Sequence, residues 1–229
     1  MNIQRLTLET QNIKIMNDFY SQMLDLPVKL ENAALEIQIG SSQLVFLENP
    51  DSSAKYHIAF NIPEQQIETA LAWLEARVEI LQDAANPISD FPNWNAHAIY
   101  FCDPAGNILE LIARHELTHE TIIPFTSRAL LNISEIGMAV PNTTEFADWT
   151  EKTLTIPKYR QGSSSFIPIG DAHGLLIAVP SGREWHPNTG IIALPHPTKI
   201  ELQTEILFEA RFFDLPYVFS NYQEIDRPS

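Results

Sequence analysis

The sequence of 229 residues is long enough for one large domain or two small ones, and its 45% hydrophobic content can supply a sizeable core. Its formal net charge of −15 argues against nucleic acid or an anionic membrane as a partner, because both bind basic surfaces. The single cysteine, Cys102, excludes an internal disulfide, and no signal peptide or apolar run of membrane-spanning length is visible. These features predict a soluble cytoplasmic protein.

The chain opens with a strand followed by a helix. Residues 4–10 alternate between apolar and polar side chains, which predicts a strand. Residues 28–40 and 43–48 predict two further strands. Between them, apolar residues recur at helical spacing: Ile13, Met16, Phe19, Tyr20 and Met23.

The same order of elements returns twice. In the second copy we expect strands over 56–62, 78–81, 98–102 and 108–113, with Pro63 in the first turn of a helix. The apolar stripe of that helix is Ile67, Ala70, Leu71 and Leu74. In the third copy we expect strands over 133–140, 166–169 and 175–179, with Asn142 as the helix cap and Glu145 at capping-box spacing. The helix stripe there is Phe146, Trp149 and Leu154.

A fourth copy is partial, with a first strand over 199–204 and no clear long helix in the tail from Ile206 to Tyr222. We therefore predict a two-module domain over 1–115, a linker over 116–132 and a divergent, shortened domain over 133–229. A repeated unit that cannot close its own core must pair with another, and the face between paired units is the expected ligand cavity.

Two stretches of sequence resemble a known superfamily. Arg5-Leu6-Thr7-Leu8-Glu9 with Asp18-Phe19-Tyr20, and His57-Ile58-Ala59-Phe60 with Tyr100 to Leu111, resemble modules of the vicinal oxygen chelate superfamily. It includes glyoxalase I, extradiol dioxygenases, and fosfomycin- and bleomycin-resistance proteins. The resemblance covers residues 1–115 well and residues 133–179 more weakly. It implies an α+β fold of paired βαβββ modules, with curved mixed sheets, outer helices and a shortened second half.

The resemblance also implies where a metal would bind. The corresponding positions on the first and last strands of the two modules are Arg5, Phe46, His57 and Glu110. In one interpretation His57 and Glu110 hold a divalent iron, manganese or zinc ion. Glu9 is a candidate helper, because Arg5, Thr7 and Glu9 share one face of a strand.

In a second interpretation the site is degenerate and metal-free. Arg5 would replace the ion and form a bidentate pair with Glu110, leaving His57 as a hydrogen-bonding or proton-transferring group. A purely structural role for this pair stays open. Glu135 matches Arg5 in the third copy, but no last-strand glutamate accompanies it, so we expect the back half to be metal-free.

Two functions follow from these interpretations. The first is an enzyme with its cavity in the N-terminal half, carrying out ring-cleavage dioxygenase or lyase and isomerase chemistry on an oxygenated small molecule. Its expected catalytic residues are His57, Glu110 and Tyr100, and its expected substrate contacts are Arg5, Thr7, Glu9 and Tyr100. The second is a non-catalytic protein that sequesters a small molecule, like the bleomycin-resistance branch. Either could be a homodimer. Residues 181–187 are either a packed loop or the rim of the ligand site.

Overall fold

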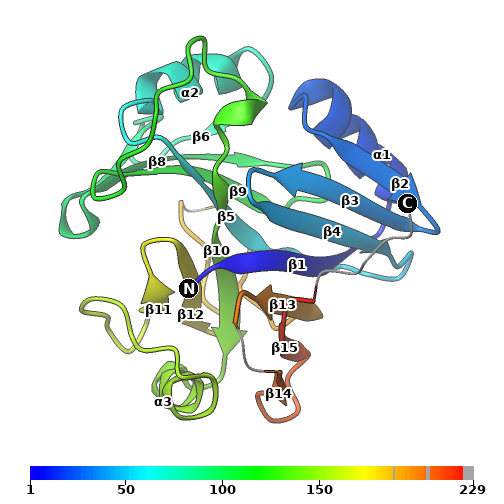
Figure 1. Cartoon of the computed structure of the whole chain (residues 1–229), viewed down its shortest axis with the longest axis vertical. Coiled ribbons are helices and arrows are strands. Elements are labelled where there is room, and N and C mark those ends of the chain that lie inside the picture. The colour runs from blue at the N-terminus through cyan, green and yellow to red at the C-terminus, as the bar shows by residue number, and fades with distance from the viewer. Residues whose placement is uncertain (188, 205–206, 224–229) are drawn as a thin grey trace.

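The strands of the chain form one continuous curved sheet built from four modules (Figure 1). The computed structural model describes residues 1–187, 189–204 and 207–223. In every module the first strand pairs in parallel with the last, and the last pairs antiparallel with the strand before it. This arrangement confirms the α+β fold of paired modules.

The first module, residues 3–48, contains one more strand than predicted. Residues 28–40 form two strands, because Asn32 and Ala33 adopt left-handed backbone angles at which the chain reverses. The side chain of Asn12 caps the helix by accepting hydrogen bonds from two backbone amides. The elements are β1 (Ile3–Thr10), α1 (Ile13–Asp18), a π-helical turn (Phe19–Met23), β2 (Val28–Glu31), β3 (Ala34–Ile39) and β4 (Ser42–Glu48).

The second module, residues 57–114, follows the predicted order and adds a short strand, β7. Pro63 lies in a turn before the helix, where its carbonyl accepts a hydrogen bond from the amide of Gln66. The predicted stripe then packs inward, with Ala70 and Leu74 fully buried. The elements are β5 (His57–Ile62), α2 (Ile67–Glu75), β6 (Ile80–Leu81), β7 (Ser89–Phe91), a 3₁₀ turn (Pro92–Trp94), β8 (Ala96–Cys102) and β9 (Ile108–Arg114).

The third module, residues 132–180, contains the longest described helix, and the fourth, residues 198–221, has strands only in its described part. Asn142 caps α3 as predicted, accepting hydrogen bonds from the amides of Thr144 and Glu145 at 3.1 Å. A 3₁₀ turn (Ser127–Ala129) precedes the third module. The elements are β10 (Asn132–Val140), α3 (Thr143–Leu154), β11 (Ile167–Asp171), β12 (Gly174–Pro180), β13 (Thr198–Leu202), β14 (Glu209–Arg211) and β15 (Tyr217–Asn221).

The modules do not pair in the order of the chain. Strand β5 of the second module pairs antiparallel with β10 of the third, and β1 of the first pairs antiparallel with β13 of the fourth. The two halves of the sheet meet where Ile3 of β1 lies opposite Ile133 of β10. The division into domains over 1–115, 116–132 and 133–229 stays a prediction. The predicted linker is itself packed against the fold, since Phe125, Ala129 and Leu130 are buried.

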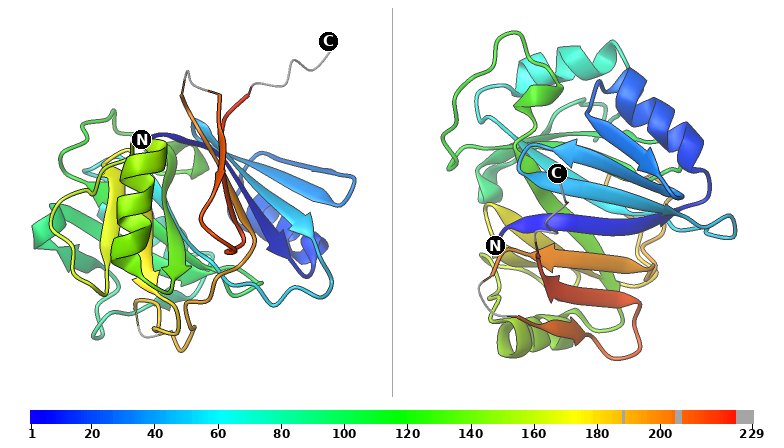
Figure 2. Two further views of the ribbon diagram at one scale, coloured as in Figure 1. Left: turned by 90° about the horizontal axis from the view of Figure 1, so that it is seen from below. Right: turned by 45° about the vertical axis from the view of Figure 1, so that its right-hand side comes forward.

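The helices cover the outer side of the sheet. Helices α1 and α2 lie at one end of the molecule and α3 lies at the other (Figures 1 and 2). The main core forms beneath them, around side chains such as Tyr20, Leu74 and Phe146. A second, smaller core lies on the opposite face of the second and third modules and includes Ala59, Ile112 and Trp185. That second face carries the candidate site.

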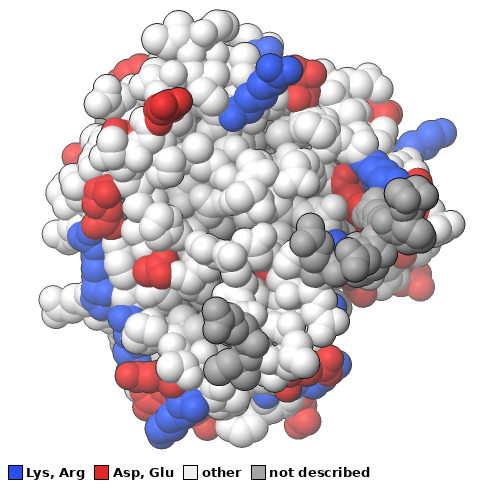
Figure 3. Space-filling model, in the orientation of Figure 1, with Lys and Arg blue, Asp and Glu red and all other residues white. Residues whose placement is uncertain are grey.

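The face shown in Figure 3 carries both signs of charge. Lysine and arginine side chains form a short run along its left edge and otherwise stand singly or beside acidic ones. None of the described helices has the length and apolar character needed to cross a membrane.

Candidate functional site

The register of four strands places the key side chains in one row across the sheet. Ala59 of β5 lies opposite Glu110 of β9 on one side and opposite Glu135 of β10 on the other. Tyr100 of β8 continues the row beyond Glu110. His57 lies two residues before Ala59, so its side chain is on the same face. The small Ala59 side chain therefore leaves room for the imidazole between the two strands that carry the carboxylates.

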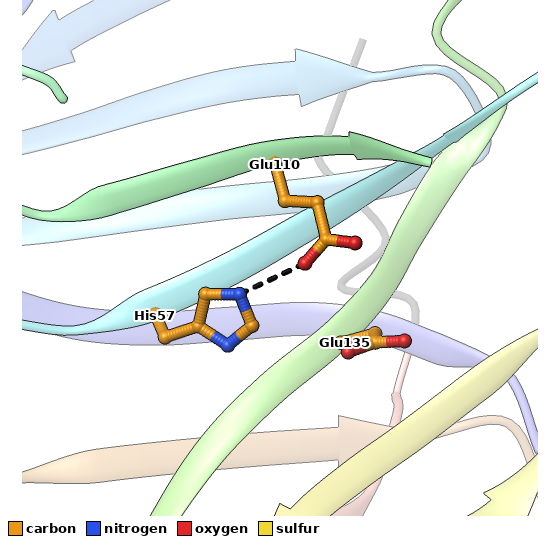
Figure 4. Close-up of side chains that lie close together, drawn as sticks. All are labelled: His57, Glu110 and Glu135. Atoms are coloured by element: carbon orange, nitrogen blue, oxygen red, sulfur yellow. Dashed lines mark hydrogen bonds and ion pairs between the residues drawn. The ribbon is translucent and has the colours of Figure 1, made fainter. Parts of the chain in front are cut away.

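His57, Glu110 and Glu135 converge in a buried cluster (Figure 4). The His57 Nε2 atom lies 2.9 Å from Glu110 Oε2. One ligand-capable atom from each of the three residues lies within 4.8 Å of the other two. The residues are only 7%, 2% and 6% exposed, in the same order. An imidazole and two carboxylates thus share one site that is shielded from bulk water.

Arg114 holds the carboxylate of Glu135. This arginine is fully buried on β9, and its guanidinium forms an ion pair with Glu135 Oε1 and donates to Ser134 Oγ from Nε at 3.4 Å and Nη2 at 3.3 Å. A buried guanidinium is tolerated only with such partners. Among the hydrogen bonds of the described residues, Glu135 Oε2 accepts none. This second oxygen is therefore available to another cation.

Burial and charge set the protonation of the cluster. Burial lowers the pKa of His57, but the hydrogen bond and charge of Glu110, with the charge of Glu135, outweigh that effect and raise it overall. Burial and the charge of Glu110 raise the pKa of Glu135, although Arg114 opposes the shift. Burial, with the charges of Glu110 and Glu135, also raises the pKa of Tyr100, so its phenol stays protonated at neutral pH. The raised pKa of His57 favours the imidazolium form beside the two carboxylates.

The cluster opens into a cavity of about 250 Å³. A segment that we call the strap, residues 181–187 and 189–193, closes one side. Backbone hydrogen bonds such as Trp185 N to Ile191 O at 2.9 Å join its two arms, and Ser181 N donates to Val140 O of β10 at 2.9 Å. The Trp185 ring lies 5.3 Å from the His57 ring, and the His186 ring lies 5.1 Å from the Tyr100 ring. The strap contributes Arg183, Trp185 and His186 to the lining, and the other wall residues are Phe91, Trp94, Ile112, Phe166, Ile177 and Val179.

The expected ion pair between Arg5 and Glu110 is wrong. Arg5 Nε donates to Gln43 Oε1 at 2.6 Å, and Arg5 Nη1 lies 3.9 Å from Glu201 Oε2. The physical reason is the pairing of β1 with β4 and β13, which moves Arg5 into the other half of the sheet. Phe46, at the other candidate ligand position of the first module, is a fully buried core residue against Tyr20.

The other predicted contacts on β1 also lie away from the cluster. Glu9 accepts a hydrogen bond from Asn49 Nδ2 at 3.0 Å, and Thr7 lies opposite Lys199 and Val45. Within the described part of the chain, neither residue lines the cavity with His57, and Arg5 does not either. The structure does bring together His57, Glu110 and Tyr100. The cavity is shared by both halves of the chain rather than confined to the N-terminal half.

The sequence led us to expect a metal-free back half, and the structure places Glu135 of the third module in the cluster with His57 and Glu110. The sequence contains a signal for this residue, since it occupies the first-strand position that Arg5 occupies in the first module. Arg114 has no comparable signal, because it lies at a strand end. Arg183 and His186 fall within residues 181–187, for which the sequence left open a packed loop or the rim of the ligand site.

Comparisons with known proteins give the fold. No protein-family model matches the sequence, and no curated protein sequence matches it significantly. A solved structure of a presumed dioxygenase from Bacillus subtilis subsp. subtilis str. 168 is similar over 90% of this chain and 71% of its own, with a TM-score of 0.63 and 16% identity. A glyoxalase/bleomycin resistance protein/dioxygenase from Nocardioides matches over 53% of this chain and 89% of its own, with a TM-score of 0.42 and 21% identity.

A lactoylglutathione lyase from Agrobacterium tumefaciens matches over 48% of this chain and 90% of its own, with a TM-score of 0.41 and 18% identity. At these identities the likeness shows the fold alone. The fold expected from the sequence resemblance is confirmed by the first match, which covers most of the chain. The chemistry has to be worked out from the residues of this site.

Proposed function

We propose that this chain, which has the fold of the vicinal oxygen chelate superfamily, is a metal-dependent enzyme for an oxygenated small molecule. His57, Glu110 and Glu135 would bind one divalent ion, and the adjoining cavity would hold the substrate. One observation carries the proposal: an imidazole and two carboxylates from three neighbouring strands converge within 4.8 Å of one another.

The donor set fits a divalent first-row metal. Two ligand atoms about 2.1 Å from one ion, at a right angle, lie about 3 Å apart. His57 Nε2 and Glu110 Oε2 are 2.9 Å apart. Carboxylates suit manganese and imidazole suits iron or zinc, so a set with two carboxylates favours manganese first. His57 Nδ1 has no hydrogen-bond partner in the described part of the chain, and the lack of such support weakens metal binding roughly 10- to 100-fold.

The cavity supplies groups for proton transfer beside this site. A bound ion would supply Lewis-acid stabilisation of negative charge on a substrate oxygen. The Tyr100 phenol, which stays protonated, can donate a hydrogen bond to the substrate. Burial lowers the pKa of His186, so its imidazole is neutral at neutral pH and can accept a proton. Its Nε2 lies 3.5 Å from Asp83 Oδ2, a carboxylate that would stabilise the imidazolium so formed.

These groups favour isomerase or lyase chemistry over ring cleavage by dioxygen. Non-heme iron oxygenases characteristically use two histidines and one carboxylate, with open positions for substrate and oxygen. This cluster has one histidine and two carboxylates instead. It is therefore better suited to a metal ion that stabilises charge while Tyr100 and His186 move protons.

A second candidate is a protein that binds its ligand without catalysis. The observation in its favour is that the His57–Glu110 and Arg114–Glu135 pairs already compensate part of each other's charge without a metal ion. In that case the cluster would be a polar floor that fixes the orientation of a sequestered molecule.

Metal analysis separates the two candidates. Protein purified without chelators and incubated with Mn²⁺ should retain one ion per chain after gel filtration, measured by plasma mass spectrometry. His57→Ala should lose the ion, whereas His173→Ala, which changes an exposed histidine of the same type, should keep it. Wild-type protein that retains no metal under these conditions would contradict the enzyme proposal and leave the binding protein.

A further inference from the structure

Arg183 of the strap is a guanidinium in the cavity wall that has no carboxylate partner among the described residues. Its Nη1 donates to the carbonyl of Ser165 at 2.6 Å, and its Nε donates to the carbonyl of Glu184 at 3.2 Å. The carboxylate of Glu184 instead accepts from the amide of Gly190 at 2.6 Å. Two carbonyl groups thus fix the guanidinium without neutralising it. A guanidinium has five N–H donors, so three remain for another acceptor.

The cavity next to Arg183 has aromatic walls and a buried N–H group without a partner among the described residues. Trp94 and Phe166 meet edge to face with ring centroids 5.7 Å apart, and such walls stack well against a planar molecule. Trp185 Nε1 has no hydrogen-bond partner in the described part of the chain, and the residue is only 6% exposed. A buried N–H group of this kind normally has an acceptor. The missing acceptor is therefore expected on a ligand.

Size and charge narrow the class of ligand. The cavity of about 250 Å³ is smaller than the roughly 300–1,000 Å³ of sites for drug-sized molecules, so it suits a single ring or a similar body. With His57 neutral, the charges of Glu110 and Glu135 cancel those of Arg114 and Arg183. A divalent ion would leave a local charge of +2 in the cavity, which attracts an anion although the whole chain carries −15.

We propose that the substrate is a small, flat organic acid. Its anionic group binds the free N–H groups of Arg183, its planar body lies against the aromatic walls, and one of its oxygens accepts a hydrogen bond from Trp185 Nε1. The remaining oxygen-bearing end faces the cluster of His57, Glu110 and Glu135. This inference rests on the proposed function, because the metal ion supplies the excess positive charge, but the role of Arg183 can be tested separately.

Benzoate and benzamide are suitable probes, because they have nearly the same shape and differ in charge. In calorimetric titrations of Mn²⁺-loaded wild-type protein, benzoate should bind at least about tenfold more tightly than benzamide, as expected for a charge-assisted contact. Arg183→Gln should remove this preference, because it should weaken the binding of benzoate and leave the binding of benzamide unchanged. Arg183→Lys should retain part of it. Arg211→Gln, which removes the same charge from β14 outside the cavity, should retain all of it.

Mn²⁺ binding is measured on the same samples by electron paramagnetic resonance. Arg183→Gln should bind Mn²⁺ like the wild type, which also reports an intact site in that variant. Wild-type protein that binds Mn²⁺ but does not prefer benzoate overturns this inference alone. An Arg183→Gln variant that keeps the full preference for benzoate over benzamide also overturns this inference alone. Wild-type protein that binds no Mn²⁺ overturns both the proposed function and this inference.

Discussion

Replacing Gly137 with alanine tests how tightly the strap is packed over the cluster. Gly137 lies on β10 two residues after Glu135, beneath the ring of Trp185. An added Cβ would lie 2.4 Å from Trp185 Cη2, 2.8 Å from Trp185 Cζ2 and 3.2 Å from His57 Cβ. The indole is rigid and its strap is tied by backbone hydrogen bonds, so neither can move without breaking contacts. We expect the free energy of unfolding to fall by about 1–3 kcal/mol, the usual cost of an overpacked core.

The assay is urea denaturation followed by circular dichroism, combined in a double-mutant cycle with Trp185→Phe. Phenylalanine lacks the ring atoms with which the new Cβ would collide. Gly137→Ala should therefore lower the free energy of unfolding by less in the Trp185→Phe variant than in the wild type. The coupling energy should be about 1 kcal/mol or more. Equal losses in both backgrounds would refute the steric reasoning. Displacement of Trp185 should also weaken benzoate binding to the Mn²⁺-loaded protein.

Two further predictions concern buried charges. Arg114→Met should lower the free energy of unfolding at pH 7, measured by urea denaturation, by about 3–5 kcal/mol, because it leaves Glu135 buried without its cation. The loss should be smaller at low pH, where the raised pKa of Glu135 favours the neutral carboxyl group. A loss that does not change with pH would contradict this reasoning. Burial raises the pKa of Asp103 to about 6. The protonated Asp103 carboxyl group therefore contributes about 3 kcal/mol to the free energy of unfolding below about pH 4. This contribution is lost as the pH rises from about 4 through 6. Asp103→Asn should flatten that part of the stability profile, and an unchanged slope would count against the burial effect.

Local patterns in the sequence predict most of the elements. The stripe of α2 and the Asn142 cap of α3 depend on neighbouring residues, and both are confirmed. The split of residues 28–40 is missed, because the left-handed turn at Asn32 and Ala33 contains no glycine or proline. The described part of the fourth module has strands without a helix, as its sequence indicates.

The pairing of modules cannot be read from such patterns. An alternating strand such as β1 has a buried face whichever strand it pairs with, and long-range packing decides the partner. The predicted pair of Arg5 and Glu110 required the first module to lie beside the second. The actual pairing of the second module with the third brings Glu135 there instead. Glu135 is visible in the sequence as the counterpart of Arg5, but its role depends on that choice of partner.

The strap is a second feature outside the reach of sequence patterns. Residues 181–187 show turns and an aromatic residue, which are more typical of a packed loop but also fit the rim of a ligand site. In the structure this segment is both, since Trp185 is buried and also lines the cavity. Irregular segments of this kind carry no periodicity that would report their contacts.

The most direct test of the site is Mn²⁺ affinity, measured by electron paramagnetic resonance, in Glu135→Gln and Glu201→Gln. Glu201 lies opposite Arg5 in the β1–β13 pair and is the matched carboxylate in the other half of the sheet. If the second and third modules build the metal site, Glu135→Gln should weaken Mn²⁺ binding by about tenfold or more and Glu201→Gln should leave it unchanged. Equal Mn²⁺ affinity in both variants and the wild type would contradict the assignment of Glu135 to the site.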